Sequence, residues 1–380
     1  MRIRAALVPD KGAAFKLEAL ELADPAPDEL IVRVAASGVC QTDLHARDDY
    51  FGMPFPCVFG HEGAGTVEKV GSRVAGLAPG DRVVMVSPAC GACEACRLEL
   101  PGYCSSARRI KFSGRLRDGR VPLRSGDAPV YGAFFQQSSF ATHSLATQAN
   151  VVKLPDDLPL EVAAAFACGV NTGAGAVLNV LRPRRGSSLA VFGAGAVGLA
   201  AVMAARIAGC TKILAVDLHD NRLALARQLG ATHAFNAAVE DPVEAIRRAT
   251  GGAGVECSLE AAGQPLALRQ AVDCLAALGV CCLVGSARKG VEAALEMAQL
   301  QQGRSLRGCI QGDAPAAQFL PKLFQHHRAG RLPVERLISF YDLHDINRAV
   351  ADAAGGKVVK AVLRIAGHEI DSFPQGGRPS

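Results

Sequence analysis

The feature that most constrains the fold is a strand-like run that leads into closely spaced glycines and then into an alanine-rich segment. Residues 188–193 read SLAVFG, residues 193–198 read GAGAVG, and Asp217 ends the next strand-like run, 19 residues after Gly198. A strand, a glycine-rich turn and a helix in this order predict a dinucleotide site, because the turn and the helix N-terminus bind a pyrophosphate. A carboxylate at Asp217 would accept ribose hydroxyls and repel a 2′-phosphate, which favours NAD over NADP. The predicted cofactor contacts are Gly193, Gly195, Val197, Gly198 and Asp217, with Arg222 either beside the adenosine or at the surface.

The segment from about 170 to 311 alternates apolar strand candidates with Ala/Leu-rich helical patterns. This alternation is typical of βαβ units and predicts an α/β fold with a doubly wound parallel sheet. We expect strands at 188–193, 212–217, 233–236, 255–263, 280–286 and 305–312, and helices at 196–209, 220–230, 241–250 and 265–277. Residues 1–150 instead carry short β-like runs between turn signals, and the C-terminal run 357–365 is a further strand candidate expected to join them.

Length and charge set the remaining limits. A chain of 380 residues exceeds the ~250–300 residues of a single core, so two domains are expected. The net charge of +5 is too small to indicate nucleic acid as the main partner, and the basic run 108–120 is interpreted as a solvated loop. The uncharged run 189–205 approaches the length of a membrane span, but its glycine pattern explains it better. No secretory signal is apparent at the start, so a cytoplasmic protein without membrane partners is expected.

Four cysteines lie close together at Cys90, Cys93, Cys96 and Cys104. Four thiolates on a short loop suit tetrahedral zinc and leave no coordination position open, so we predict a structural zinc lobe at 88–106. An iron–sulfur cluster is the alternative, but its motif more often ends in Cys-Pro, whereas Gly102 and Tyr103 precede the last cysteine here. Because a cytoplasmic protein is expected, the thirteen cysteines of the chain are not expected to form a disulfide framework.

Two further motifs carry metal-ligand side chains: GVCQTDLH at 38–45 and GHEGAG at 60–65. Together with the cysteine lobe and GAGAVG, they make the chain resemble the zinc-dependent medium-chain alcohol dehydrogenases. Within that family, residues 134–140, which read FFQQSSF, and the stretch 312–330 resemble the aryl-alcohol (benzyl alcohol) branch. The resemblance runs from end to end. It implies a GroES-like, mostly-β catalytic domain over 1–169 and 312–380, and a Rossmann NAD-binding domain over 170–311.

The resemblance also assigns roles to single residues. It implies a second, catalytic zinc held by Cys40, His61 and Cys168, with Glu62 as an alternative ligand and Asp43 behind His61. It implies that Thr42 and His45 relay the alcohol proton, while His45 as an ordinary surface histidine remains the alternative. It places Thr172 beside the nicotinamide, and Gln41 and Lys360 at positions where relatives often carry arginine or histidine toward the cofactor. The remaining cysteines are interpreted as packing residues: 57, 210, 257, 274, 281, 282 and 309.

The expected substrate is a hydrophobic primary alcohol, aryl or allylic, because the family alignment gives mainly apolar pocket walls: Val86, Phe134, Phe135, Ser286 and Ile310. S-(hydroxymethyl)glutathione or a general aliphatic alcohol is the nearest alternative. Two other classes, a zinc-ribbon nucleic-acid binder and a zinc-free quinone reductase, each leave part of the motifs unused. Family members are dimers or tetramers, and we expect a homodimer paired through a strand edge near 300–312, with a homotetramer as the alternative.

Overall fold

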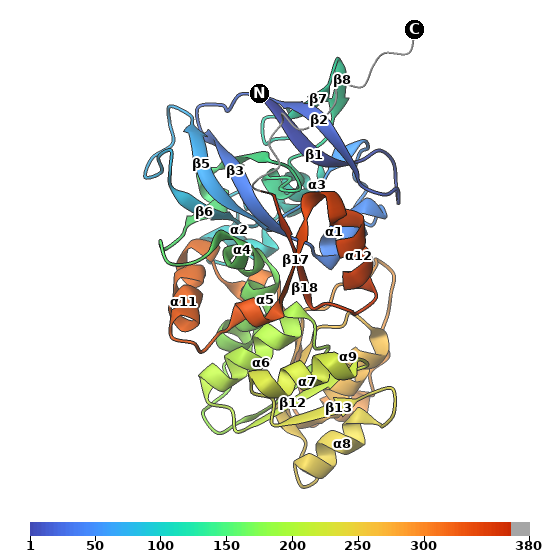
Figure 1. The fold of residues 1–380 in the computed structure, drawn as a ribbon. Coiled ribbons are helices and arrows are strands. Elements are labelled where there is room, and N and C mark those ends of the chain that lie inside the picture. The colour runs from blue at the N-terminus through green and yellow to red at the C-terminus, as the bar shows by residue number, and fades with distance from the viewer. Residues whose placement is uncertain (366–380) are drawn as a thin grey trace.

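The computed structural model describes residues 1–365 and divides into a mostly-β part and a part built on one parallel sheet, drawn above and below each other in Figure 1. The parallel sheet has the order β13-β12-β11-β14-β15-β16, and every neighbouring pair is parallel. Its strands are β11 (Ser188–Phe192), β12 (Lys212–Asp217), β13 (His233–Asn236), β14 (Val255–Glu260), β15 (Leu275–Leu283) and β16 (Ser305–Gly308). This order confirms the predicted doubly wound α/β sheet.

Four helices connect these strands: α6 (Ala196–Ala208), α7 (Asp220–Leu229), α8 (Pro242–Ala249) and α9 (Pro265–Asp273). The strand predicted at 255–263 ends at Glu260, because the Glu260 carboxylate accepts the amides of Ala262 and Gly263 and turns the chain. The helix predicted at 265–277 ends four residues early, since Leu275 already pairs with Val255 in the sheet.

The mostly-β part contains two sheets. One has the order β4-β1-β2-β7-β8; the other follows β10-β6-β5-β3-β18-β17, with β9 also paired to β3. Strand β18 pairs antiparallel with β3, which confirms that the C-terminal run returns to the N-terminal part. The strands are β1 (Arg2–Val8), β2 (Lys16–Leu22), β3 (Glu29–Gly38), β4 (Cys57–Val58), β5 (Gly63–Val70), β6 (Arg82–Met85), β7 (Leu123–Ser125), β8 (Ala128–Val130), β9 (His143–Thr147), β10 (Val151–Lys153), β17 (Ile338–Asp342) and β18 (Lys360–Arg364).

The helices around these sheets are short, apart from the 13-residue α11. They are α1 (Gln41–Arg47), α2 (Glu94–Arg97), α3 (Ala107–Phe112), α4 (Leu160–Ala163), α5 (Gly169–Gly175), α11 (Ala316–Arg328) and α12 (Ile346–Ala354). The short helix α10 (Met297–Leu300) instead lies between β15 and β16 of the parallel sheet. The solvated loop predicted at 108–120 is therefore wrong in its first half. Ile110 and Phe112 anchor α3 to the core, and the Phe112 ring stacks on Phe51 at 4.2 Å.

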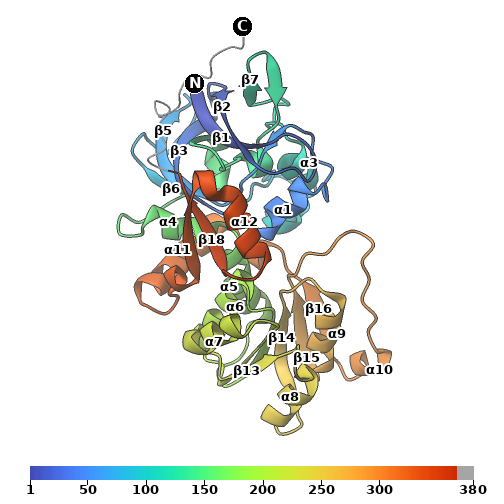
Figure 2. The ribbon, with the colours of Figure 1, turned by 45° about the vertical axis from the view of Figure 1, so that its right-hand side comes forward.

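Helix α5 joins the two parts, as the turned view in Figure 2 shows near the centre of the molecule. It packs on α6 so closely that a Cβ at Gly173 would lie 1.9 Å from the carbonyl oxygen of Val197. One apolar cluster continues from Val84 through α5 and α6 to Leu259, so the two parts share a core. Within 1–365, no single helix has the length and apolar character to cross a bilayer; only the bent pair Leu160–Ala167 and Gly169–Leu181 meets both criteria together. The C-terminal run GGRPS at 376–380, for which the sequence predicts a loose end, lies outside the described residues.

Candidate active site and metal centres

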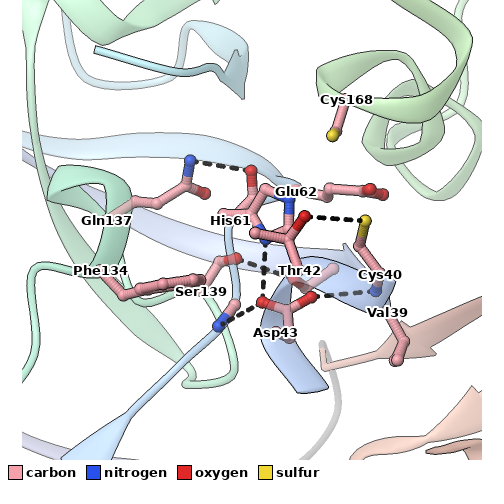
Figure 3. A network of polar contacts seen from close by, with 12 residues as sticks. Val39, Cys40, Thr42, Asp43, His61, Glu62, Phe134, Gln137, Ser139 and Cys168 are labelled. Carbon is pink, nitrogen blue, oxygen red and sulfur yellow. Dashed lines mark hydrogen bonds and ion pairs between the residues drawn. The ribbon is translucent and has the colours of Figure 1, made fainter. Parts of the chain in front are cut away.

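Residues far apart in the sequence meet beside the start of α1 and the start of α5. Cys40 precedes α1, His61 and Glu62 lie just before β5, and Cys168 precedes α5. One ligand atom from each of these four residues lies within 4.8 Å of the others. Figure 3 shows Cys168 reaching from its helix toward the group formed by Cys40 and His61.

Asp43 is fully buried and fixes two of these residues. Its Oδ1 lies 2.9 Å from His61 Nδ1 and accepts the Gly60 amide at 3.2 Å, while its Oδ2 accepts the Cys40 amide at 2.9 Å (Figure 3). Burial alone would lower the pKa of His61, but the charge and hydrogen bond of Asp43 raise it above its usual range. The other ring nitrogen, Nε2, is buried without a hydrogen-bond partner. An imidazole oriented by a carboxylate, with its second nitrogen free, fits a metal ligand.

The two thiols of this cluster face each other. The hydrogen bond with Cys168 lowers the pKa of Cys40, and the same contact raises the pKa of Cys168, so one thiol loses its proton more readily than the other. Cys40 Sγ also lies 3.7 Å from Thr42 Oγ1, and Gln311 Nε2 lies 3.9 Å from Cys168 Sγ. Two sulfurs and one imidazole nitrogen are a donor set that suits zinc.

Glu62 and Lys360 form a buried ion pair that the sequence did not indicate. Their side chains are 0% and 4% exposed, and the Lys360 ammonium also donates to the carbonyl oxygen of Val39 at 3.1 Å. Burial raises the pKa of Glu62 to about 7, against the opposing effect of Lys360. Burial would lower the pKa of Lys360, but the Glu62 charge raises it. Lys360 also lines the cleft described below, so the predicted cofactor residue is tied to the metal-ligand cluster as well.

The four lobe cysteines lie within the same 4.8 Å limit. Their Sγ atoms are 3.5 Å apart for Cys93 and Cys96 and 3.9 Å apart for Cys90 and Cys96, near the edge of a tetrahedron with Zn–S of about 2.3 Å. Amides of Ser105 and Cys96 lower the pKa of Cys93 to about 5, whereas burial raises that of Cys96 to about 12. The lobe therefore fits a metal with four sulfur ligands.

None of the thirteen cysteines, all within the described chain, forms a disulfide. Six of the seven predicted packing cysteines are buried, and Cys210 is half-buried.

A cleft of about 750 Å³ runs from the glycine-rich turn to the metal-ligand cluster. Gly193 has φ +95°, which favours glycine, and a Cβ at Gly198 would lie 1.7 Å from the Gly193 carbonyl oxygen. The Asp217 carboxylate accepts the amides of Ala194, Leu218 and His219, and Arg222 Nη1 lies 4.0 Å from it. Of the residues predicted to contact cofactor, the cleft is lined by Gln41, Gly193, Gly195, Val197, Asp217, Arg222 and Lys360. Gly198 packs behind the turn, and Thr172 lies on α5 without lining this cleft.

His45 lines the same cleft and is 7% exposed. Its ring stacks on Tyr50 with centroids 4.1 Å apart, and the Arg288 guanidinium lies 3.9 Å from the centre of the Tyr50 ring. Burial lowers the pKa of His45, and Arg288 lowers it further, while Cys40 and Asp48 act in the opposite direction. His45 Nδ1 has no hydrogen-bond partner. Neither Tyr50 nor Arg288 carried a sequence signal, because the stack joins two segments distant in the chain.

The five predicted pocket residues have different surroundings. The Phe135 ring stacks on His61 at 4.6 Å and the Phe134 ring meets His61 edge-on at 5.7 Å (Figure 3 labels Phe134). Val86 is buried in the shared core, Ser286 lines the cleft, and Ile310 is 46% exposed. Sequence reasoning missed Lys111, which is 5% exposed and lies 5.4 Å from the centre of the Phe135 ring.

Comparison with known proteins agrees with this geometry. Residues 26–156 match the family model for an alcohol dehydrogenase GroES-like domain, and residues 196–325 match that for a zinc-binding dehydrogenase. Geraniol dehydrogenase of Castellaniella defragrans is 41% identical over 363 residues, 95% of this chain and 97% of its own. Among solved structures, benzyl alcohol dehydrogenase of Acinetobacter calcoaceticus is 40% identical with a TM-score of 0.93, over 96% of this chain and 100% of its own. An alcohol dehydrogenase zinc-binding domain protein of Burkholderia ambifaria is 46% identical, also with a TM-score of 0.93, over 96% and 99% of the two chains.

Proposed function

Since the chain belongs to the zinc-dependent medium-chain alcohol dehydrogenases, we propose that it oxidises hydrophobic primary alcohols, aryl or allylic, reversibly to aldehydes with NAD as hydride acceptor. One observation carries the proposal: Cys40 of the metal-ligand cluster and Gly193 of the glycine-rich turn line one continuous cleft. A metal-activated substrate and a dinucleotide would therefore meet in the same space.

We assign the catalytic zinc to Cys40, His61 and Cys168, with Glu62 as an alternative ligand, and a structural zinc to Cys90, Cys93, Cys96 and Cys104. Zinc at the first site supplies Lewis acidity, which makes an alcohol hydroxyl more acidic. Asp43 keeps His61 in the tautomer whose Nε2 is free to bind metal. Lys360 neutralises Glu62 inside the protein, which limits the competition of this carboxylate for the metal.

The alcohol proton needs a route that does not admit bulk water. We assign Thr42 to its first step, since Thr42 Oγ1 lies 3.7 Å from Cys40 Sγ. His45 is the acceptor, because its Nδ1 is unpartnered and its ring lines the cleft. A lowered pKa keeps His45 neutral, and so able to accept the proton, at a lower pH than an exposed histidine.

The turn Gly193, Gly195 and Val197, with Gly198 packed behind it, is assigned to the pyrophosphate, and Asp217 to the adenosine ribose. The Asp217 carboxylate, which also accepts hydrogen bonds from three backbone amides, favours NAD over NADP. We place Gln41 and Arg222 at the cofactor as well, since both line the cleft. Thr172 is assigned to the nicotinamide side by family resemblance alone.

The substrate class is inferred from relatives and from aromatic side chains at the metal-ligand cluster. Phe134 and Phe135 pack on His61 from the buried core, so the metal-ligand cluster has aromatic surroundings that suit a flat, apolar alcohol. Relatives about 40% identical are a geraniol and a benzyl alcohol dehydrogenase. We retain Val86, Ser286 and Ile310 as further proposed contacts of the substrate.

We further propose that the chain divides into a catalytic domain, 1–169 with 312–380, and a cofactor domain, 170–311. A homodimer through β16 is favoured, because this strand ends the sheet, is exposed throughout and is followed by the exposed Ile310. Met297, Leu300 and Leu306 add exposed apolar side chains nearby. Thirteen free thiols suit a reducing compartment such as the cytoplasm.

The test combines metal analysis with an activity panel. Elemental analysis should find two zincs per chain, and NADH formation should be faster with benzyl, cinnamyl and allylic alcohols than with short aliphatic ones. A chelator should abolish the reaction. Highest activity with S-(hydroxymethyl)glutathione would reject the aryl/allylic assignment, and activity in metal-free protein would reject the mechanism.

A further inference from the structure

The segment from Cys309 to Asp313 lies between the cysteine lobe and Cys168. Three consecutive residues in it have positive φ: Gln311 at 60°, Gly312 at 75° and Asp313 at 49°. Left-handed backbone is unfavourable for residues other than glycine, and it persists only where surrounding contacts hold it. The contacts of this segment therefore indicate what it is built to connect.

On one side, the segment is held by the lobe. The Tyr103 hydroxyl contacts Asp313 Oδ1 at 2.8 Å and the carbonyl oxygen of Gly308 at 3.1 Å, and Tyr103 directly precedes the lobe ligand Cys104. A Cβ at Gly102 would lie 2.4 Å from the Ile310 carbonyl oxygen, so the two backbones touch. The lobe and the segment thus form one packed unit.

The Asp313 carboxylate organises this unit from within. Its side chain is 3% exposed and pairs with Arg307 at 3.1 Å. Besides Tyr103, it accepts the amide of Ile310 at 3.3 Å, which closes the turn on itself. A buried carboxylate with three donors fixes the conformation of the segment.

On the other side, the segment holds Cys168 and the helix that follows it. Gln311 Nε2 donates to Cys168 Sγ at 3.9 Å, and Asn171 Nδ2 donates to the Gln311 carbonyl oxygen at 3.0 Å. Asn179 Nδ2 donates to the Gly312 carbonyl oxygen at 2.8 Å. Gly312 also packs directly on α5, since a Cβ at Gly175 would lie 2.4 Å from the Gly312 Cα.

We propose that residues 309–313 link the two metal sites, so that the lobe holds Cys168 in place through Tyr103 and Gln311, which act as positioning residues. The proposal rests on the proposed function, because it takes Cys168 as a ligand of the catalytic zinc. According to the proposal, the lobe stabilises more than its own loop. A disturbed lobe also speeds zinc release from the site that contains Cys168.

The test follows zinc release from the full-length, zinc-loaded protein into an excess of a chromogenic chelator. The Cys40→Ala variant identifies the signal of the lobe. Tyr103→Phe and Gln311→Leu should each speed release from the catalytic site about tenfold, in the range found when contacts behind a metal ligand are removed. Gln311→Leu should leave the lobe signal unchanged. With cobalt at the catalytic site, the sulfur-to-metal absorption band of Gln311→Leu should shift, because Cys168 loses an N–H donor.

Tyr341→Phe is the matched control, since Tyr341 donates to Asp352 at 2.9 Å at another place in the fold. It should release zinc like the wild type. Unchanged release in both Tyr103→Phe and Gln311→Leu would overturn the proposal, and Gln311→Leu decides alone if Tyr103→Phe does not fold. A wild-type protein with one zinc would instead reject the proposed function, whereas two zincs with unchanged variants would reject only this link.

Discussion

The two cysteine-rich sites of this protein are built in different ways. The lobe gathers Cys90, Cys93, Cys96 and Cys104 from one short segment, and three of the four side chains are partly exposed. The second site takes Cys40, His61 and Cys168 from three distant segments and places them among buried groups such as Asp43 and Lys360. The first site is a property of local sequence, whereas the second exists only once the fold has formed.

Because of this difference, we expect the lobe to contribute to stability and the second site to contribute to catalysis. Four sulfur ligands saturate a zinc ion and can only organise the loop around it. The second cluster has fewer strong ligands, an orienting carboxylate behind its histidine and a cleft in front of Cys40. Substitutions at the two sites should therefore change different measured quantities.

The largest effect is expected for Cys40→Ala. Loss of this ligand should lower kcat/KM by at least about a thousandfold, since metal-ion stabilisation of developing charge is worth several kcal/mol. NADH formation at saturating benzyl alcohol measures the loss. Cys57→Ala is the matched control, because Cys57 is a buried thiol outside both clusters. Equal activity in Cys40→Ala and wild type would show that Cys40 is not needed for the reaction, and the proposed difference between the two sites would then be wrong.

A smaller effect is expected for Asp43→Asn, which keeps the shape of the side chain and removes its charge. Asp43 holds both His61 and the Cys40 amide, so zinc affinity at this site should fall about 10–100-fold. Competition with a chelator of known affinity measures the change. The lobe should keep its zinc, and equal weakening of both sites would contradict the assignment of Asp43 to one of them.

The same contrast explains what the sequence could predict. The glycine-rich turn, the alternation of strands and helices and the lobe depend on short-range spacing, so motif analysis found them. The Glu62–Lys360 pair and the Tyr50–Arg288 contact join residues hundreds of positions apart, and no local pattern indicates them. The misassigned loop at 108–112 has a related cause, because the helix there is stabilised by tertiary contacts of Phe112 with Phe51.

For the lobe, Cys93→Ser should mainly lower thermal stability. Removing one of the four proposed ligands should weaken zinc binding by residues 88–106. Because the shift in Tm per kcal/mol shrinks as the chain lengthens, each lost kcal/mol should lower Tm by no more than about 2 °C. Differential scanning calorimetry measures the shift. Activity at low temperature should fall only a few-fold, through the link at Tyr103. A fall as deep as that of Cys40→Ala would show that the lobe takes part in the chemistry directly.

The smallest effect is expected for Arg288→Gln, which tests the stack on His45. Burial lowers the pKa of His45 and the Arg288 charge lowers it further, so removing that charge should raise the pKa. A proton acceptor must be neutral, hence the acid side of the kcat/KM profile should move to higher pH, by a fraction of a unit because Arg288 is exposed. Arg288→Lys keeps the charge and should leave the profile in place. A shift toward lower pH in Arg288→Gln would contradict the relay. The group that limits activity would then have a lower pKa without the Arg288 charge, whereas the pKa of His45 should rise.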